Sequence, residues 1–329
     1  MSSTSKASQR INALLDDNSF VEIGAMVTAR ATDFDLKQAE TPSDGVITGY
    51  GVIGGSLVYV YSQDASVMNG TVGEMHARKI AGLYNLAMKT GAPIIGLLDS
   101  AGLRLQEATD ALDAFGTIYR KMTDASGVIP QISAVFGNCG GGLAIMAAMS
   151  DFTFMEEKNA KLFVNSPNAL SGNTTAKCDT SSAAFQSEKT GNVDFVGDED
   201  EVLSGIRRLV SILPANNEEN LAFDECTDDL NRLTAELAGC VEDTAAALAI
   251  ISDNNEFVEV KDAYAKDMVT GFIRLDGVTV GAVANRSGVL DENGNLAEKY
   301  EAALSPEGCE KAADFVNFCD AFDIPVLTL

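Results

Sequence analysis

The sequence predicts an α/β protein of two units, in which the second unit begins to repeat the first. Its 329 residues are enough for two sizeable cores. Strand-like and helix-like patterns alternate along the chain, as they do where parallel strands are joined by helical crossovers. Val46–Tyr50 matches Met268–Phe272, and Gly55 matches Gly277, both at an offset of 222 residues (49 to 271, and 55 to 277).

The first elements follow from hydrophobic periodicity and turn residues. A short helical pattern over 9–16 precedes an alternating strand over 20–23. Two β-rich runs flank Gly54-Gly55, a pair that tolerates positive φ, so a hairpin is expected over 47–61. Apolar helical spacing then predicts a helix over 74–90 that stops at Gly91.

A continuous apolar run over 92–98 is typical of a strand buried on both faces of a parallel sheet. A helix over 110–126, a strand over 131–136 and a helix from the glycine triplet at 140 to about Met149 are expected to follow. This order leaves two loops at strand ends, 99–107 and 137–142. Ligands of open α/β folds bind beyond the carboxyl ends of strands, so these loops are the candidate site.

The rest of the chain is less regular until the repeat begins. Residues 166–197 are rich in Ser, Thr, Asn and Gly and are interpreted as a lid or substrate loop, and the acidic stretch 216–236 as the link between the units. The strand pattern over 257–260 matches that over 20–23. Further matches, Lys79 with Lys311 and 92–95 with 324–327, have an offset of 232, which predicts a ten-residue insertion around 290–304.

Composition excludes several classes of function. A formal charge of −25 argues against nucleic-acid binding, which needs a basic surface. Neither a membrane span nor an apolar signal core is visible, so we expect a cytoplasmic protein without direct membrane insertion. The six cysteines are scattered singly, as reduced structural thiols are, and not as zinc ligands. An anionic ligand would require clustered cations, for which the candidates are Arg78, Lys79, Arg104, Arg120 and Lys121.

The chemistry that remains is that of backbone N–H groups. The single histidine, His76, lies in the middle of a predicted helix, where a helix-surface residue or a polar residue with satisfied hydrogen bonds is expected rather than a catalytic base. Gly140-Gly141-Gly142 lies at a strand-to-helix transition, where unpaired N–H groups bind phosphate or stabilise an oxyanion. No Lys-Ser or Lys-Thr follows, which favours the oxyanion role over a phosphate loop. Close helix–strand packing is the alternative.

Three segments carry a resemblance to a known family: 62–74, 99–107 (DSAGLRLQE) and 125–142 (ASGVIPQIS, then GNCGGG). Together they resemble the N-terminal half of the biotin-dependent acyl-CoA carboxyltransferases, which are the β-type subunits of acetyl-CoA and propionyl-CoA carboxylases and the α-type subunits of methylmalonyl-CoA decarboxylases. The resemblance extends from about residue 10 to the end, and 264–281 and 312–329 resemble the opening of the family's C-terminal half.

The resemblance implies a crotonase-like (ClpP/crotonase) fold in each half. It places a complete N-terminal, acyl-CoA-binding domain at 1–215, and a linker with an incomplete C-terminal domain at 216–329. Catalysis would rest on backbone groups of Gly141, Gly142, Gly102 and Leu103, which stabilise the enolate of the acyl group. The substrate would also be bound at Gly140, Ala101, Arg104, Arg78 and Lys79, and no metal is implied.

The implied reaction moves a carboxyl group between carboxybiotin and acetyl-CoA, propionyl-CoA or methylmalonyl-CoA. Biotin itself takes the α-proton, and this explains the missing side-chain base. Expected partners are a biotin carboxyl carrier protein or domain, a biotin carboxylase or decarboxylase subunit, and further copies of the chain. Because the matching biotin-side residues would lie beyond Leu329, the isolated chain is expected to be inactive and to expose an apolar patch of Phe315, Val316, Phe318, Phe322 and Val326.

Two alternatives remain open. Another crotonase-fold enzyme, such as an enoyl-CoA hydratase, would share the oxyanion loops, but it carries an acid/base glutamate at the position of Ala144. A non-catalytic half that only binds CoA is the other alternative. The family pattern often has glycine at Ala101 and alanine at Gly140, and 173–192 matches poorly, so acyl specificity does not follow from the resemblance.

Overall fold

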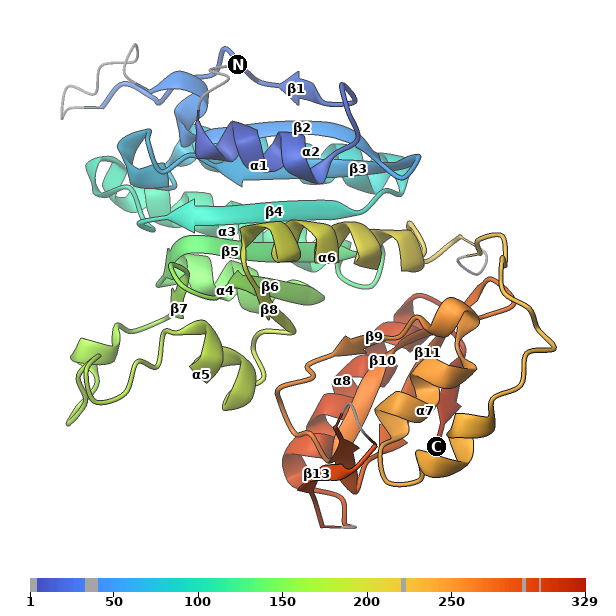
Figure 1. The fold of residues 1–329 in the computed structure, drawn as a ribbon. Helices are drawn as coiled ribbons and strands as arrows, with labels where there is room; N and C mark the ends of the chain where they lie inside the picture. The colour runs from blue at the N-terminus through green and yellow to red at the C-terminus, as the bar shows by residue number, and fades with distance from the viewer. Residues whose placement is uncertain (1–4, 33–40, 220–222, 292–293, 302) are drawn as a thin grey trace. The chain divides into compact units, whose positions relative to one another are not determined.

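The computed structural model describes residues 5–32, 41–219, 223–291, 294–301 and 303–329 (Figure 1). The chain divides into two compact units, Met1–Gln186 with Phe195–Ser211, and Ser187–Asp194 with Ile212–Leu329. The second unit thus includes a short segment, Ser187–Asp194, that precedes the last helix of the first unit in the sequence.

The first unit is built on one mixed sheet, in the order β1-β2-β3-β4-β5-β6-β8, with β7 paired to β5. β1, β2 and β3 are antiparallel, and the strands from β3 onward are parallel. The strands are β1 (Val21–Ile23), β2 (Val46–Ile53), β3 (Ser56–Gln63), β4 (Ile94–Ser100), β5 (Gln131–Gly140), β6 (Phe152–Glu156), β7 (Lys161–Phe163) and β8 (Phe195–Gly197).

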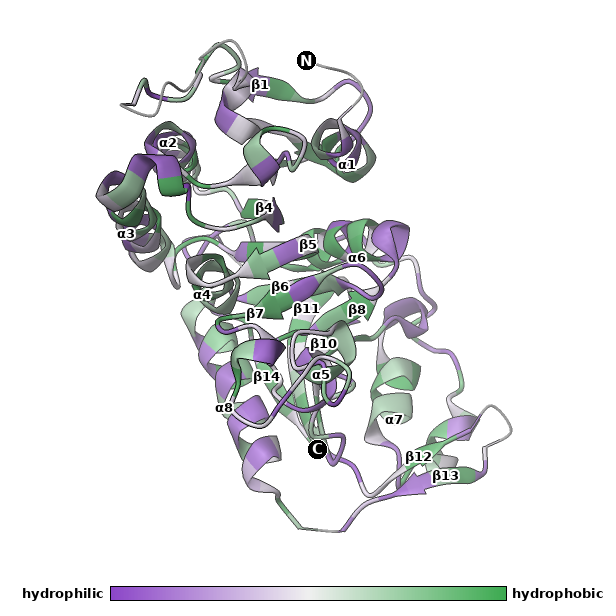
Figure 2. Cartoon of the chain, turned by 90° about the vertical axis from the view of Figure 1, so that its left-hand side faces the viewer, coloured by the Kyte–Doolittle hydropathy of each residue, from purple (hydrophilic) through white to green (hydrophobic). Residues whose placement is uncertain are grey.

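Helices cover both faces of this sheet. Figures 1 and 2 show α1 and α6 on one face and α2, α3 and α4 on the other. α2 packs against α3, and its predicted stop, Gly91, adopts the left-handed conformation at the C-cap. The helices are α1 (Lys6–Leu14), α2 (Glu74–Thr90), α3 (Ala108–Ala125), α4 (Gly142–Ala148), α5 (Ala183–Glu188) and α6 (Glu199–Ile212).

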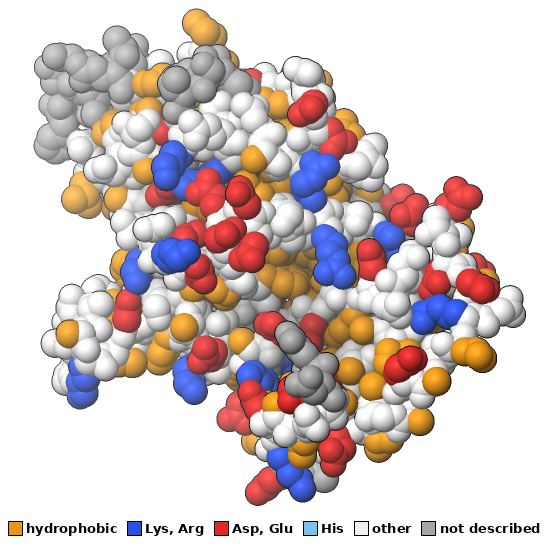
Figure 3. All heavy atoms as spheres, viewed as in Figure 1, with side chains coloured by type: hydrophobic (Ala, Val, Ile, Leu, Met, Phe, Trp, Pro, Cys, Tyr) orange, Lys and Arg blue, Asp and Glu red, His pale blue; other side chains and the backbone are white. Residues whose placement is uncertain are grey.

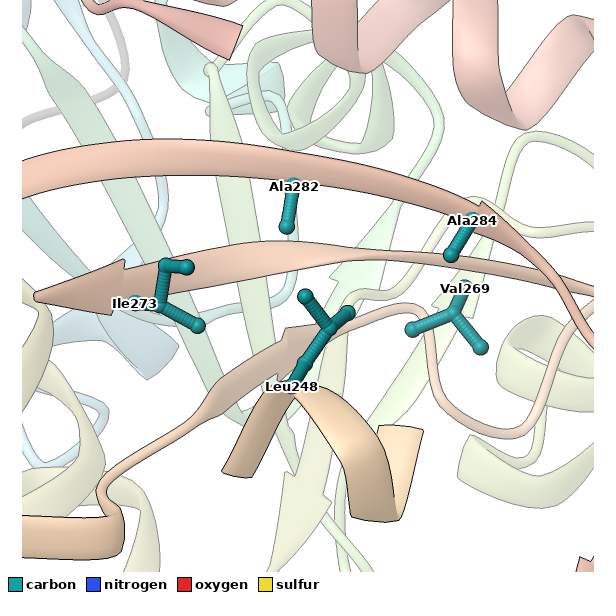
Figure 4. Packing of buried hydrophobic residues seen from close by; sticks show 5 residues of the cluster. All are labelled: Leu248, Val269, Ile273, Ala282 and Ala284. Carbon is teal, nitrogen blue, oxygen red and sulfur yellow. The ribbon is translucent and has the colours of Figure 1, made fainter. Parts of the chain in front are cut away.

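The second unit has a four-stranded sheet in the order β14-β11-β10-β9, in which only β11 and β14 are parallel. Its elements are α7 (Thr244–Ile251), β9 (Val258–Val260), β10 (Met268–Leu275), β11 (Val278–Asn285), α8 (Pro306–Ala321) and β14 (Val326–Thr328). Val269 and Ile273 face Leu248 of α7 (Figure 4), while Phe272, on the other face of β10, packs on Phe315 of α8. The sheet is therefore covered on both sides.

The predicted repeat is confirmed. α1-β1-β2-β3-α2-β4 and α7-β9-β10-β11-α8-β14 follow the same order with the same pairing directions. Gly49 and Gly271 show why a glycine is needed at this point of both copies: a Cβ would lie 2.3 Å from the carbonyl oxygen of Val21 or of Val258. The predicted insertion around 290–304 includes β13 (Leu296–Lys299), which pairs with β12 (Gly288–Leu290) just before it in a separate two-stranded sheet.

Two expectations were wrong in part. The supposed lid over 166–197 contains α5 and ends in β8, a strand of the main sheet, so it is not one continuous loop. The supposed apolar patch is also reduced, because Phe315 and Phe322 are only 4% and 2% exposed and pack on their own unit. Val316 and Val326 are exposed as expected. Within the described ranges, no helix combines the length and apolar character needed to cross a membrane.

Candidate functional site

The two predicted glycine loops lie next to each other at the carboxyl ends of β4 and β5. Ser100 pairs with Cys139 across these strands, after an irregularity in register. A Cβ added to Gly102 would lie 3.5 Å from the carbonyl oxygen of Gly140. The structure therefore brings together loops that are separated by nearly forty residues of sequence, because neighbouring parallel strands end at the same edge of the sheet.

The glycine triplet forms a sharp turn between β5 and α4. Gly141 has φ 62° and ψ −126°, a conformation that side-chain-bearing residues rarely adopt. Its N–H donates to the carbonyl oxygen of Phe163 at 2.9 Å. Gly142 begins α4, and its carbonyl oxygen accepts a hydrogen bond from the Tyr119 hydroxyl at 2.6 Å. The turn is thus anchored to β7 on one side and to α3 on the other.

The loop after β4 is held by its own set of bonds. The N–H of Gly102 donates to Ser100 Oγ at 3.0 Å, and the N–H of Ala101 donates to the carbonyl oxygen of Asn69 at 2.9 Å. The N–H of Val72 donates to the carbonyl oxygen of Gly102 at 2.8 Å, and the N–H of Arg104 donates to the carbonyl oxygen of Val72 at 3.0 Å. Leu103 lies between these anchored residues.

Of the four residues predicted to stabilise the oxyanion through their N–H groups, two use these groups in hydrogen bonds within the protein. The N–H groups of Gly141 and Gly102 are used internally, as described above. None of the hydrogen bonds among the described residues uses the N–H of Gly142 or of Leu103. Gly142 is in the first turn of a helix, where N–H groups lack intrahelical acceptors. Gly142 and Leu103 therefore offer one free donor from each loop.

Arg104, expected to meet a CoA phosphate, is fully buried. Its guanidinium forms ion pairs with Asp44 at 2.5 Å and with Glu107 at 3.0 Å, and donates to the carbonyl oxygen of Thr71 at 2.7 Å. Glu107 also accepts from the N–H of Glu74 at 2.6 Å, which caps the start of α2. The buried guanidinium is bound to these internal partners and links the loops, and the contact of Arg104 with CoA stays a prediction.

The other predicted cations differ in accessibility. Lys79 is buried, and its ammonium donates to Ser43 and to the carbonyl oxygen of Val46. Burial lowers the pKa of Lys79 to about 8. Arg78 is exposed but paired with Glu74 at 2.6 Å, and Arg120 is exposed on α3. Of the predicted CoA contacts, only the exposed cations and the loop backbone are accessible.

His76 confirms the expectation of a satisfied structural histidine. It is fully buried, with Gln63 Nε2 at 3.3 Å from its Nε2 and the carbonyl oxygen of Asp44 at 3.0 Å from its Nδ1. Burial lowers the pKa of His76 to about 3, and burial raises the pKa of Asp44 although Arg104 acts to lower it. A neutral imidazole therefore joins α2 to the end of β3 and to the segment before β2.

Three residues near the loops were missed by the sequence analysis. Tyr119, Phe163 and Asp44 contact Gly142, Gly141 and Arg104 from elements distant in sequence. No local pattern could have found them, because each contact depends on how the strands and helices pack. Ala144 is buried at the position where a hydratase has its glutamate. Among the described residues, no cluster of three or more His, Cys, Asp or Glu residues could hold a metal ion.

Comparison with known proteins decides the family. The model of the carboxyl transferase domain matches residues 4–329. The chain belongs to this family. It is 39% identical to the propionyl-CoA carboxylase beta chain of Roseobacter denitrificans, over 98% of the chain and 64% of that protein. It is 38% identical to the methylmalonyl-CoA decarboxylase subunit alpha of Veillonella parvula, over 98% of the chain and 63% of that protein.

A solved structure agrees with this carboxyl transferase assignment. The crystal structure of transcarboxylase 12S, described as a hexamer with methylmalonyl-coenzyme A and methylmalonic acid bound, superimposes with a TM-score of 0.88 at 36% identity. The match covers 98% of this chain and 63% of that one. The chain therefore spans a little under two thirds of the length of these relatives, and its mixed α/β architecture matches that of transcarboxylase 12S over the part that superimposes.

Proposed function

We propose that this carboxyl transferase chain holds a short acyl-CoA at the two glycine loops, for exchange of a carboxyl group at the acyl α-carbon. The observation that supports this most is the pair of free donors, Gly142 N–H and Leu103 N–H, on adjacent loops at one sheet edge. We further propose a crotonase-like fold for each unit. Acetyl-CoA, propionyl-CoA and methylmalonyl-CoA are the candidate substrates, as the names of the relatives suggest.

In this proposal the backbone supplies the catalytic charge stabilisation. Forming an enolate at the α-carbon places negative charge on the thioester oxygen, and two fixed N–H donors offset that charge at no reorganisation cost. The donors are uncharged, so they act equally well across the neutral pH range. A side-chain base is not required of this chain, which agrees with Ala144 at the position of the hydratase glutamate.

Biotin is assigned no residue of this chain. The family implies carboxybiotin, delivered by a biotin carboxyl carrier protein, as the source of the carboxyl group. A second glycine loop would be needed to hold it, and the described residues of the second unit contain no counterpart of Gly140–Gly142. We propose that the 329 residues bind the thioester and do not transfer a carboxyl group unaided. A biotin carboxylase or decarboxylase subunit and further copies of the chain are the proposed partners.

A pair of variants at Gly142 tests the assignment. Gly142 is the first residue of α4, a position that accepts proline, so Gly142→Pro removes the N–H while preserving helical φ. Gly142→Ala adds the same Cβ, 2.8 Å from the Tyr119 hydroxyl, but retains the N–H. Calorimetric titration with propionyl-CoA and with free CoA should show that the unchanged chain prefers the thioester. Gly142→Pro should lose more of this preference than Gly142→Ala, because both variants crowd the Tyr119 hydroxyl but only Gly142→Pro lacks the N–H.

The contrary result is equally clear. If the unchanged chain binds propionyl-CoA and free CoA with the same affinity, the thioester does not use these donors, and the site is at most a CoA-binding surface. Equal loss in both variants would attribute the effect to crowding by the Cβ rather than to the N–H.

A further inference from the structure

The free N–H of Gly142 lies between two anchored groups of the same chain segment. On its N-terminal side, the N–H of Gly141 is bound to Phe163, and on its C-terminal side, the carbonyl oxygen of Gly142 is bound to the Tyr119 hydroxyl. The peptide group that carries this N–H is also held locally, because the carbonyl oxygen of Gly141 accepts from the N–H of Ala144 at 3.1 Å. Glycines have a wide choice of backbone conformations, so the bonds to Phe163 and from Tyr119 restrict the two residues on either side of this peptide group.

We infer that Tyr119 is a positioning residue, whose hydroxyl fixes the direction of the Gly142 N–H toward the thioester oxygen. That the N–H binds the thioester oxygen rests on the proposed function. The hydrogen bond from Tyr119 to Gly142 does not, because it is present in the chain without a ligand. At 2.6 Å the bond from Tyr119 to Gly142 is short, and the ring is held by Phe115, whose centroid lies 5.9 Å away. The hydroxyl therefore approaches the turn from a fixed place on α3.

The surroundings of Gly142 leave little room for another arrangement. A Cβ there would come within 2.8 Å of the Tyr119 hydroxyl and 3.3 Å of the Phe115 ring. Partial burial raises the pKa of Tyr119, so the hydroxyl remains a donor throughout the neutral and mildly alkaline range. Tyr119 does not act on the substrate itself. It acts through the carbonyl group of Gly142, which lies in the peptide group next to the one that carries the Gly142 N–H.

Tyr119→Phe removes the hydroxyl and retains the ring, and Tyr300→Phe is the matched control. Tyr300 also donates a hydrogen bond through its hydroxyl, to Glu298, but it lies in the second unit. We expect Tyr119→Phe to weaken propionyl-CoA binding by about three- to ten-fold, the value of one neutral hydrogen bond, with free CoA affinity unchanged. Tyr300→Phe should leave both affinities unchanged.

The amide of Gly142 can be observed without any ligand. Glycine labelled with ¹³C at its carbonyl and with ¹⁵N gives carbonyl-coupled amide signals only where glycine follows glycine, which in this sequence means Gly55, Gly141 and Gly142. The Gly142 signal is identified by its loss in Gly142→Ala. We expect it to move in Tyr119→Phe and to stay in place in Tyr300→Phe, while Gly55 is constant in both.

The two readouts separate the inference from the proposed function. A Gly142 signal at its unchanged position in Tyr119→Phe overturns the inference, whatever the affinities are. Where the unchanged chain does prefer the thioester, a signal that moves in Tyr119→Phe while that preference stays at its original value also overturns the inference, because the hydroxyl is then only structural. If the unchanged chain has no thioester preference but the Gly142 signal moves, the proposed function fails and the positioning of Gly142 by Tyr119 stands.

Discussion

Asp44, Arg104 and Glu107 form a buried charged cluster beneath the first glycine loop. All three are at most 3% exposed, and Arg104 contacts both carboxylates. Removing one member of such a cluster leaves an uncompensated buried charge, which is far more costly than losing a surface ion pair. The cluster therefore explains Arg104 by the loops it joins, without any ligand.

Gly73 shows how closely this cluster approaches the backbone. A Cβ at Gly73 would lie 2.3 Å from Glu107 Oε1 and 2.6 Å from Arg104 Nη1. The sequence shows that a glycine precedes α2, but it does not show that the side chains of Glu107 and Arg104 leave no room for a Cβ there. The partner of Arg104, Asp44, is sixty residues away along the chain. Sequence reasoning could therefore identify the motif around Arg104 but not the role of its charge.

His76 predicts how stability depends on pH. Its pKa is about 3 in the folded chain against 6.5 for the free group, so between these values the unfolded chain binds a proton that the folded chain does not. The contribution is present above pH 6.5 and is lost as pH falls toward 3. At pH 5 the loss is about 2 kcal/mol of unfolding free energy. Urea unfolding at pH 7 and pH 5 measures it.

His76→Gln provides the comparison, because it removes the only histidine in the chain and retains a polar group. The difference in unfolding free energy between pH 7 and pH 5 should be smaller by about 2 kcal/mol in this variant. An unchanged difference would mean that His76 accepts a proton in the folded state and that the acid sensitivity arises from carboxylates.

Lys79 and Lys311 are equivalent elements of the two repeats. Lys79 donates to the carbonyl oxygen of Ser43, just before β2, and to that of Val46, the first residue of β2. Lys311 donates to the carbonyl oxygens of Lys261, Tyr264 and Met268, at 2.7, 2.8 and 2.8 Å. Val46 and Met268 themselves are 222 residues apart, the offset of the repeat (46 to 268). Each lysine thus joins the helix after a hairpin to the start of that hairpin.

Substituting either lysine should destabilise its own unit. Lys79→Met and Lys311→Met keep most of the aliphatic stem but leave buried carbonyl groups without a donor, at about 1–3 kcal/mol for each unsatisfied group. Hydrogen exchange should show faster opening of β2 and α2 in the first variant, and of β10 and α8 in the second. Arg78→Met on the exposed face of α2 is the control. Uniform loosening of both units in either variant would argue against separate cores.

The elements were predictable where glycine spacing and apolar runs determine them. The match between Gly49 and Gly271 correctly indicated two equivalent hairpins, because both positions exclude a side chain. The match could not show which faces of the last helix are covered. Phe315 and Phe322 were expected to be exposed, yet Phe315 packs on Phe272 within the second unit's own sheet. Covering a helix face depends on tertiary packing, which a repeat in sequence does not describe.

At the scale of the whole molecule, charge is the dominant property. The net charge is −25, and several of the cations near the loops are already paired: Arg30 with Glu74 and Asp110, Arg78 with Glu74, and Lys121 with Asp124. Figure 3 likewise shows basic side chains lying beside acidic ones on the face in view. A CoA ester, whose phosphates are anionic, must therefore approach against the field of the protein.

This field predicts an unusual dependence on salt. At low ionic strength the repulsion acts over about 20 Å or more, and at 0.15 M it is screened beyond about 8 Å. We expect the affinity for propionyl-CoA to rise as sodium chloride increases from about 20 to about 200 mM. The thioester of propionate with N-acetylcysteamine has no phosphates, so its affinity should be nearly independent of salt and serves as the control.

If propionyl-CoA affinity instead falls with salt while the control is constant, local cations outweigh the net field. Exposed Arg78 and Arg120 would then be the residues to substitute, since the buried Arg104 and Lys79 are bound to internal oxygens.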